Sequence, residues 1–201
     1  MGGLEIPKGI KPKEFFERFL PEAFKTSVAD MDLSGYKDIN FTMEFNIVGP
    51  EGGIYGISLI NGDRLEVKAG KLNGAMVSIE MSDKVFMDGL SGNIPEFPIE
   101  DFLANPRIIT TLPPQEAKQR IDDLKNIEGM MEVEAQRGNE KIELNVKFNG
   151  ADTPSCKLTG DINELMALMK GEMNPVQGFM SGKYKIQGSL PFAMQLQKIS
   201  V

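Results

Sequence analysis

The chain has 201 residues, of which 41% are hydrophobic and 25% charged, and its formal net charge is −7. These values are typical of a globular protein with one large or two small domains, and the negative charge argues against binding to nucleic-acid phosphates. The absence of histidine and the single cysteine exclude Ser-His-Asp triads, Cys-His pairs, internal disulfides and histidine-based metal sites.

The first residues, 1–8, contain no apolar signal core, and no segment approaches the ~20 apolar residues that a transmembrane helix needs. We therefore expect a cytoplasmic protein. Residues 13–24 then show apolar side chains near helical period, with Pro21 expected to kink or restart the helix. The phenylalanines on this face either seal the core or wall an apolar cavity. The candidates for the second role are Phe15, Phe19 and Phe24.

Four strands and a helix are predicted to follow. The strands cover residues 40–48, 54–60, 64–69 and 75–81. Asn61-Gly62 between the second and third strands is a typical hairpin turn. Ser82 is expected to cap a helix that ends near Gly92.

Residues 94–114 contain five prolines and form the best candidate boundary between two units. We place the units at 13–112 and 113–201. The second unit begins with a helix over 115–126. Strands are predicted at 130–135, 141–148 and 155–159, and Asp161 with Glu164 has the spacing of a capping box for the next helix.

The two units align through their last common strand and the helix after it. The pairs are Ile79 with Leu158, Phe86 with Leu165, Leu90 with Met169, and Gly92 with Gly171, all at an offset of 79 residues. A fixed offset of this kind indicates an internal duplication. The alternative is that any two strand–helix joints share this apolar spacing.

The last 41 residues, 161–201, hold five of the 13 methionines. A methionine-rich helix stops at Gly171, and Asn174-Pro175 begins a second short helix. A basic strand follows at 183–187, and a final amphipathic helix comes after it. Methionine adapts to irregular apolar partners, so these residues either fill an ordinary core or line a site for varied apolar molecules. The lysines of the strand either face water or anchor an anionic headgroup.

The order of these pieces resembles the C-terminal signature of the sterol carrier protein type 2 family. The matching elements are Gly171-x-x-Asn174-Pro175, then Phe179-Met180-x-Gly182-Lys183-x-Lys185-Ile186-x-Gly188, then Ala193-Met194. The resemblance is close over 142–196 and looser upstream. Two features depart from it: Leu190-Pro191-Phe192 replaces small residues and a leucine, and Ser200-Val201 replaces a peroxisomal Ser-Lys-Leu type of ending.

The resemblance implies an α+β fold with a mixed, mostly antiparallel sheet covered by helices, and an apolar tunnel between sheet and helices. It implies no catalytic residue and no cofactor. The expected ligand is a lipid, a fatty acyl chain or a sterol-like molecule, with transient membrane contact and no nucleic acid. The candidate lining residues of the second unit are Leu165, Met169, Met173, Phe179, Met180, Ile186 and Met194.

Three functions remain open from the sequence. The first is a non-catalytic lipid carrier. The second is an accessory module that uses the same fold to bind a protein partner or to dimerise. The third is an enzyme, which the missing histidine and the lack of an acid–base constellation disfavour.

Overall fold

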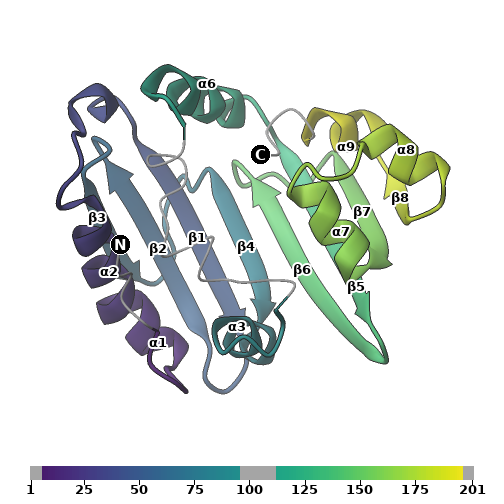
Figure 1. The fold of residues 1–201 in the computed structure, drawn as a ribbon, viewed down its shortest axis with the longest axis horizontal. Coiled ribbons are helices and arrows are strands. Elements are labelled where there is room, and N and C mark those ends of the chain that lie inside the picture. Colours follow the sequence, from purple (N-terminus) through teal and green to yellow (C-terminus); the bar gives the residue numbers. More distant parts are fainter. Residues whose placement is uncertain (1–5, 96–111, 197–201) are drawn as a thin grey trace.

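A single eight-stranded sheet forms the centre of the computed structural model, which describes residues 6–95 and 112–196 (Figure 1). Its strand order is β3-β2-β1-β4-β6-β5-β7-β8. Only β1–β4 and β5–β7 pair in parallel, so the predicted α+β class with a mixed, mostly antiparallel sheet is confirmed. The strands are β1 (Phe41–Val48), β2 (Gly53–Ile60), β3 (Arg64–Ala69), β4 (Val77–Ser82), β5 (Gly129–Arg137), β6 (Glu140–Phe148), β7 (Ser155–Asp161) and β8 (Tyr184–Gly188).

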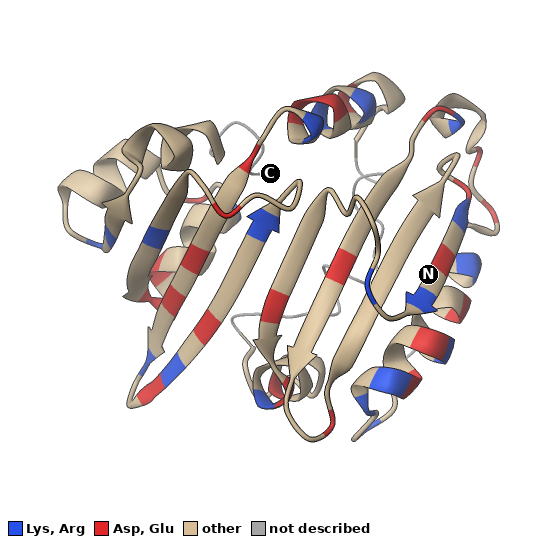
Figure 2. Cartoon of the chain, turned by 180° about the vertical axis from the view of Figure 1, so that it is seen from behind, with Lys and Arg blue, Asp and Glu red and all other residues tan. Residues whose placement is uncertain are grey.

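The helices lie mainly over one face of this sheet. Figure 1 shows α3 and α7 in front of the strands, and Figure 2, from behind, shows the middle of the sheet uncovered and carrying charged residues. Strand alternation produces this division, because successive side chains point to opposite faces. The described helices are α1 (Pro12–Glu14), η1 (Phe15–Phe19), α2 (Leu20–Val28), η2 (Ser34–Tyr36), α3 (Asp83–Leu90), α6 (Pro114–Lys125), α7 (Ile162–Met169), α8 (Pro175–Met180) and α9 (Leu190–Leu196). None of them is long and apolar enough to cross a membrane.

The N-terminal helical segment covers β1 and β2 with aromatic rings. Phe16 is fully buried, and its ring stacks on Tyr55 with centroids 4.5 Å apart and on Phe86 with centroids 5.2 Å apart. Phe15 completes the cluster in an edge-on contact with Phe16. The expected change at Pro21 takes the form of a π-helical turn, η1, after which α2 restarts with Pro21 near its first position, where a missing N–H is tolerated.

The two halves share a hairpin, a parallel strand and a helix in the same order, although the first half has an additional strand, β3, between its hairpin and its parallel strand. In the first, β1 and β2 form a hairpin, β4 returns parallel to β1, and α3 follows. In the second, β5 and β6 form a hairpin, β7 returns parallel to β5, and α7 follows. This repeated order supports our proposal of an internal duplication. Superposition of β4–α3 on β7–α7 in a crystal structure tests it, and different strand-to-helix angles would argue against common descent.

The two halves share one sheet because β4 pairs antiparallel with β6. On the uncovered face, Glu80 of β4 accepts hydrogen bonds from Asn46 of β1 at 2.6 Å and from Asn145 of β6 at 3.2 Å. The proposed units 13–112 and 113–201 therefore meet inside a continuous hydrogen-bonded layer. Most of the proline-rich boundary lies outside the described residues.

The residues that the sequence predicts to cap helices do so, with one exception. Ser82 accepts a hydrogen bond from the Val85 N–H at the start of α3, as predicted. Asp161 caps α7 by accepting from the Asn163 N–H. The predicted capping box with Glu164 is wrong, because the Glu164 carboxylate pairs with the Lys183 ammonium at 2.9 Å. The ion pair with Lys183, which directly precedes β8, takes the place of a second cap contact.

We predict that Phe16→Ala lowers the free energy of unfolding by about 3–5 kcal/mol, because it removes a fully buried ring from a close-packed cluster. The matched control is Phe179→Ala, whose ring is 42% exposed and whose loss should cost less than about 1 kcal/mol. Urea unfolding followed by circular dichroism measures both values. Equal losses would show that the cluster does not hold the first half together.

Candidate functional site

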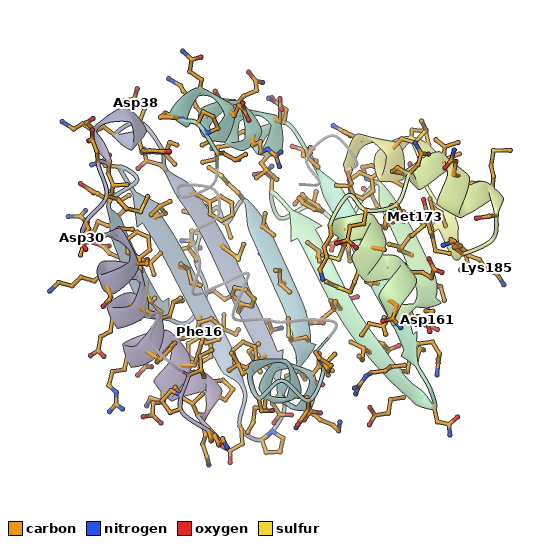
Figure 3. All side chains as sticks on the ribbon, in the orientation of Figure 1. Phe16, Asp30, Asp38, Asp161, Met173 and Lys185 are labelled. Atoms are coloured by element: carbon orange, nitrogen blue, oxygen red, sulfur yellow. The ribbon has the colours of Figure 1, made fainter. Side chains whose placement is uncertain are left out.

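An apolar cavity of about 540 Å³ lies in the second half of the molecule, between the sheet and helices α7, α8 and α9. Strands β5 to β8 form its floor. Figure 3 labels Met173 on the segment that connects α7 with α8, beside this cavity, and Phe16 far away over the first half. The lining residues are Met131, Val133, Phe148, Cys156, Leu158, Leu165, Leu168, Met169, Gly171, Met173, Asn174, Pro175, Tyr184, Ile186, Ala193 and Leu196.

Strand register explains the apolar floor. Leu158 of β7 stands opposite Val133 of β5 on one side and Ile186 of β8 on the other, so the three side chains share a face. Their neighbours Glu132 and Lys157 are also paired in the register and therefore point to the uncovered face. The floor is thus built by period-two alternation in three adjacent strands.

The wall above the floor begins with α7. Leu165 is buried on its inner side, and Met169 at its last position lines the cavity while remaining 38% exposed. Gly171 then has a φ of +71°, in the left-handed region where glycine is favoured, and turns the chain away from the helix. Asn174 caps α8 by accepting a hydrogen bond from the Gln177 N–H at 3.0 Å.

Tyr184 fixes α8 against the edge strand. Its ring is buried, and its hydroxyl donates a hydrogen bond to the Pro175 carbonyl. Burial raises the pKa of Tyr184, so the hydroxyl keeps its proton and the hydrogen bond at neutral pH. Gly178 is required at this contact, since a Cβ there would lie 2.8 Å from the Tyr184 ring and 2.5 Å from the Met173 sulfur.

The cavity offers little chemistry beyond apolar contact. No charged side chain belongs to its described lining. Cys156 is its one nucleophilic group, and burial raises the pKa of that thiol to about 11, so it is protonated at neutral pH. Among residues 6–95 and 112–196, no three His, Cys, Asp or Glu side chains gather in a way that could hold a metal ion. The arrangement suits a ligand with a large apolar portion.

The candidate residues of the second unit divide into two groups. Leu165, Met169, Met173 and Ile186 line the cavity. Phe179, Met180 and Met194 do not, and their side chains lie 42%, 80% and 52% exposed on the surface. The spacing signature does not distinguish inward from outward positions on helices as short as α8 and α9.

The three phenylalanines proposed for the first half also lie away from the cavity. Phe15 and Phe19 are buried in the main core, where their rings stack with centroids 5.6 Å apart. Phe24 belongs to a separate cluster with Ile39, Leu59, Ala117 and Ile121. In this structure they seal the core, which is the alternative that the sequence left open.

Sequence reasoning missed the strand residues of the floor. Met131, Val133, Cys156 and Leu158 lie on strands that were predicted, but their side chains were not assigned to a site. Tyr184 lies on the predicted basic strand 183–187 and was likewise given no role. The available signal was the alternation of apolar with charged residues in β5 and β7, which marks one face for burial.

Comparison with known proteins gives sequence matches to sterol carrier proteins. Residues 109–200 match the model of the SCP-2 sterol transfer family. Sterol carrier protein 2 of Gallus gallus is 39% identical over 56 residues, which is 28% of this chain and 10% of that protein. The Bos taurus protein of the same name is 40% identical over 53 residues, or 26% of this chain and 10% of that one. The chain thus spans about a tenth of the length of these relatives.

Two solved structures are similar at lower identity. The solution structure of sterol carrier protein domain 2 of Helicoverpa armigera has a TM-score of 0.33 and 20% identity, covering 56% of this chain and 85% of that one. The apo form of Sterol Carrier Protein 2 from Yarrowia lipolytica has a TM-score of 0.36 and 22% identity, covering 56% and 91%. The likeness to the SCP-2 sterol transfer family is therefore carried by the sequence match over residues 109–200.

We predict that Cys156 resists alkylation by iodoacetamide in the folded protein at neutral pH, because the thiolate is the reactive form and burial raises its pKa to about 11. Mass spectrometry of the intact protein measures the rate. The rate should rise as the pH approaches 11. Protein unfolded in urea is the control and should react readily at neutral pH. Equal rates in the two states would mean that Cys156 is open to solvent.

Proposed function

We propose that this chain binds and transfers a lipid in the cavity beneath α7, because residues 109–200 match the model of the SCP-2 sterol transfer family that the sequence resembles. The ligand class is a fatty acyl chain, a sterol-like molecule or another long apolar compound. The observation that carries the proposal is the lining of the cavity, which is mostly apolar and whose described residues include no charged group.

The size of the cavity fits this role. Its volume of about 540 Å³ lies within the range of roughly 300–1,000 Å³ that small-molecule sites occupy. Each buried CH₂ group contributes ~0.8 kcal/mol, so a chain of about fourteen gains roughly 11 kcal/mol before costs. Association and ordering oppose this by about 4–15 kcal/mol. At the low end of this cost, about 7 kcal/mol remains, which corresponds to binding at roughly 10 micromolar and allows both carriage and release.

We propose that this binding is non-catalytic. A bound lipid would meet side chains of leucine, methionine, isoleucine and phenylalanine, together with a protonated thiol and a tyrosine hydroxyl that is already hydrogen-bonded. None of these groups activates a nucleophile or transfers a proton at neutral pH. Binding in this cavity requires no cofactor.

The second candidate function is an accessory module that binds a protein partner or dimerises. The observation in its favour is the exposure of large apolar side chains on α8 and α9, because such patches often mark interaction sites. Native mass spectrometry of the purified chain separates the two functions. A lipid that copurifies favours the carrier, and an empty chain that forms a dimer or a complex with one protein favours the module.

We predict that Met169→Asp weakens binding of a fluorescent fatty acid by roughly tenfold or more, because it brings a charge to the wall of an apolar cavity. Met169 is 38% exposed, so the variant can fold with the carboxylate partly hydrated. Displacement titrations measure the affinity, and circular dichroism confirms the fold.

Two matched variants complete this experiment. Val48→Asp makes the same change at an exposed apolar position far from the cavity and should bind like the parent chain. Lys183→Ala removes an exposed ion-pair partner of Glu164 and should have a small effect. If Met169→Asp binds normally while Lys183→Ala loses binding, charge holds the ligand and the cavity mechanism is wrong.

A further inference from the structure

The lining of the cavity is buried on the side beneath α9. Phe148 of β6, Cys156 of β7 and Leu196 of α9 line the cavity, and they are only 5%, 4% and 7% exposed. All three belong to one cluster of buried residues. The same cluster contains Val77 and Ile127, which are buried and do not line the cavity. Packed side chains therefore close the cavity on this side.

Another part of the lining, where α7 connects to α8, is open to solvent. Met169 at the end of α7 is exposed, and so are the lining residues Gly171 and Asn174. An ionised carboxylate loses much free energy when it leaves water without a partner, and no charged side chain belongs to the described lining. We therefore expect a fatty acid to leave its carboxylate at these exposed residues and to place its methyl end beneath α9.

Two aromatic rings form the closed end. The ring of Phe148 meets the ring of Phe192 edge-on, with centroids 6.2 Å apart and an interplanar angle of 75°. Phe192 is 2% exposed and does not line the cavity, so it supports Phe148 from behind. We call these two residues the end wall. A phenylalanine side chain rotates about only two bonds, so the end wall adapts less to a ligand than methionine does.

The first residue of β5 leaves the space that the Phe192 ring occupies. Gly129 has a φ of +137°, and a Cβ there would collide with the Pro154 carbonyl oxygen and lie 2.8 Å from the Phe192 ring. The N–H of Phe192 also donates a hydrogen bond to the Ser189 Oγ at 3.3 Å. The ring is thus held between α9 and the start of β5, and it supports the end wall from a fixed position.

Phe192 lies where this chain departs from the signature of the sterol carrier protein type 2 family. The signature has small residues and a leucine in place of Leu190-Pro191-Phe192. A leucine side chain is shorter than a phenylalanine ring, so a leucine behind Phe148 would leave room for that ring to move away from the cavity. The end wall is therefore a feature of this chain and not of the signature.

We propose that the end wall sets the length of acyl chain that the cavity accepts. The inference rests on the proposed function, because the wall acts only on a ligand that occupies the cavity. Each further CH₂ that becomes buried raises the affinity roughly fourfold. Once the methyl end reaches Phe148, a further CH₂ stays at the exposed side of the cavity and contributes nothing. Affinity along a series of saturated fatty acids should consequently rise and then stop rising at one chain length, the break point.

The test is displacement of a fluorescent fatty acid from the intact chain by saturated fatty acids of increasing length. Phe148→Leu and Phe192→Leu should both move the break point to longer acids, because each opens the closed end. For an acid one CH₂ longer than the break point of the parent chain, these variants should show a gain of roughly fourfold. Acids shorter than that break point should bind the variants and the parent chain with affinities within about twofold.

A variant with a larger side chain should have the opposite effect. Ala193 lines the cavity next to Phe192 and is only partly buried, so Ala193→Leu can fold and should move the break point to shorter acids. The matched control is Phe179→Leu, which makes the same change in a ring that is 42% exposed and does not line the cavity. This control should keep the break point of the parent chain. Circular dichroism confirms the fold of each variant.

Folded Phe148→Leu, Phe192→Leu and Ala193→Leu variants that all keep the break point of the parent chain would overturn the role of the end wall, while the carrier function would stand. An affinity that rises through the whole series in the parent chain would overturn it as well. A parent chain that binds no fatty acid of any length would instead contradict the proposed carrier function, and the role of the end wall with it.

Discussion

The apolar face of the eight-stranded sheet is the constraint on which the rest of the structure depends. Pairing of β4 with β6 makes one continuous layer, and alternation gives that layer a row of apolar side chains on the face toward α3 and α7. Removing this face from water is the main favourable contribution to folding. The helices are consequently placed where they cover it, and the opposite face carries hydrogen-bonded and paired charges such as Glu80 and Glu134.

The two halves cover the shared face with different side chains. At corresponding positions, Phe86 of α3 contacts the rings of Phe15 and Phe16, whereas Leu165 of α7 borders the cavity. Aromatic rings from the N-terminal helix fill the space over the first half. Over the second half, aliphatic and methionine side chains leave about 540 Å³ free. A similar order of elements, with β3 as an addition in the first half, thus supports a filled core at one end and a proposed ligand site at the other.

Local sequence signals predicted most of the fold. The strands, the Ser82 cap and the positive φ angles of Asn61 and Gly62 at the hairpin all follow from alternation, capping and turn chemistry. The resemblance to the sterol carrier family also led to the prediction that Leu165, Met169, Met173 and Ile186 would line one site, and these four residues line the cavity. The sequence did not predict that β4 pairs with β6, because that contact joins segments far apart in the chain and leaves no local signature.

The outward position of Met180 and Met194 could not be predicted for a related reason. An apolar residue on a short helix has the same pattern whether it packs inward or stays exposed, and only the placement of Tyr184 and Gly178 determines which side of α8 is inner. The floor residues of β5 and β7 became recognisable once the register was known. The alternation of these residues was visible in the sequence, but the sequence did not indicate which helices cover them.

A crystal structure with a bromine-labelled fatty acid tests the central claim most directly, because anomalous scattering locates the bromine without assumptions about the rest of the ligand. We expect the bromine between Leu165 of α7 and Ile186 of β8, inside the cavity. A bromine over the first half, near Phe15 and Phe19, or a cavity that stays empty while the fatty acid binds elsewhere, would contradict the account.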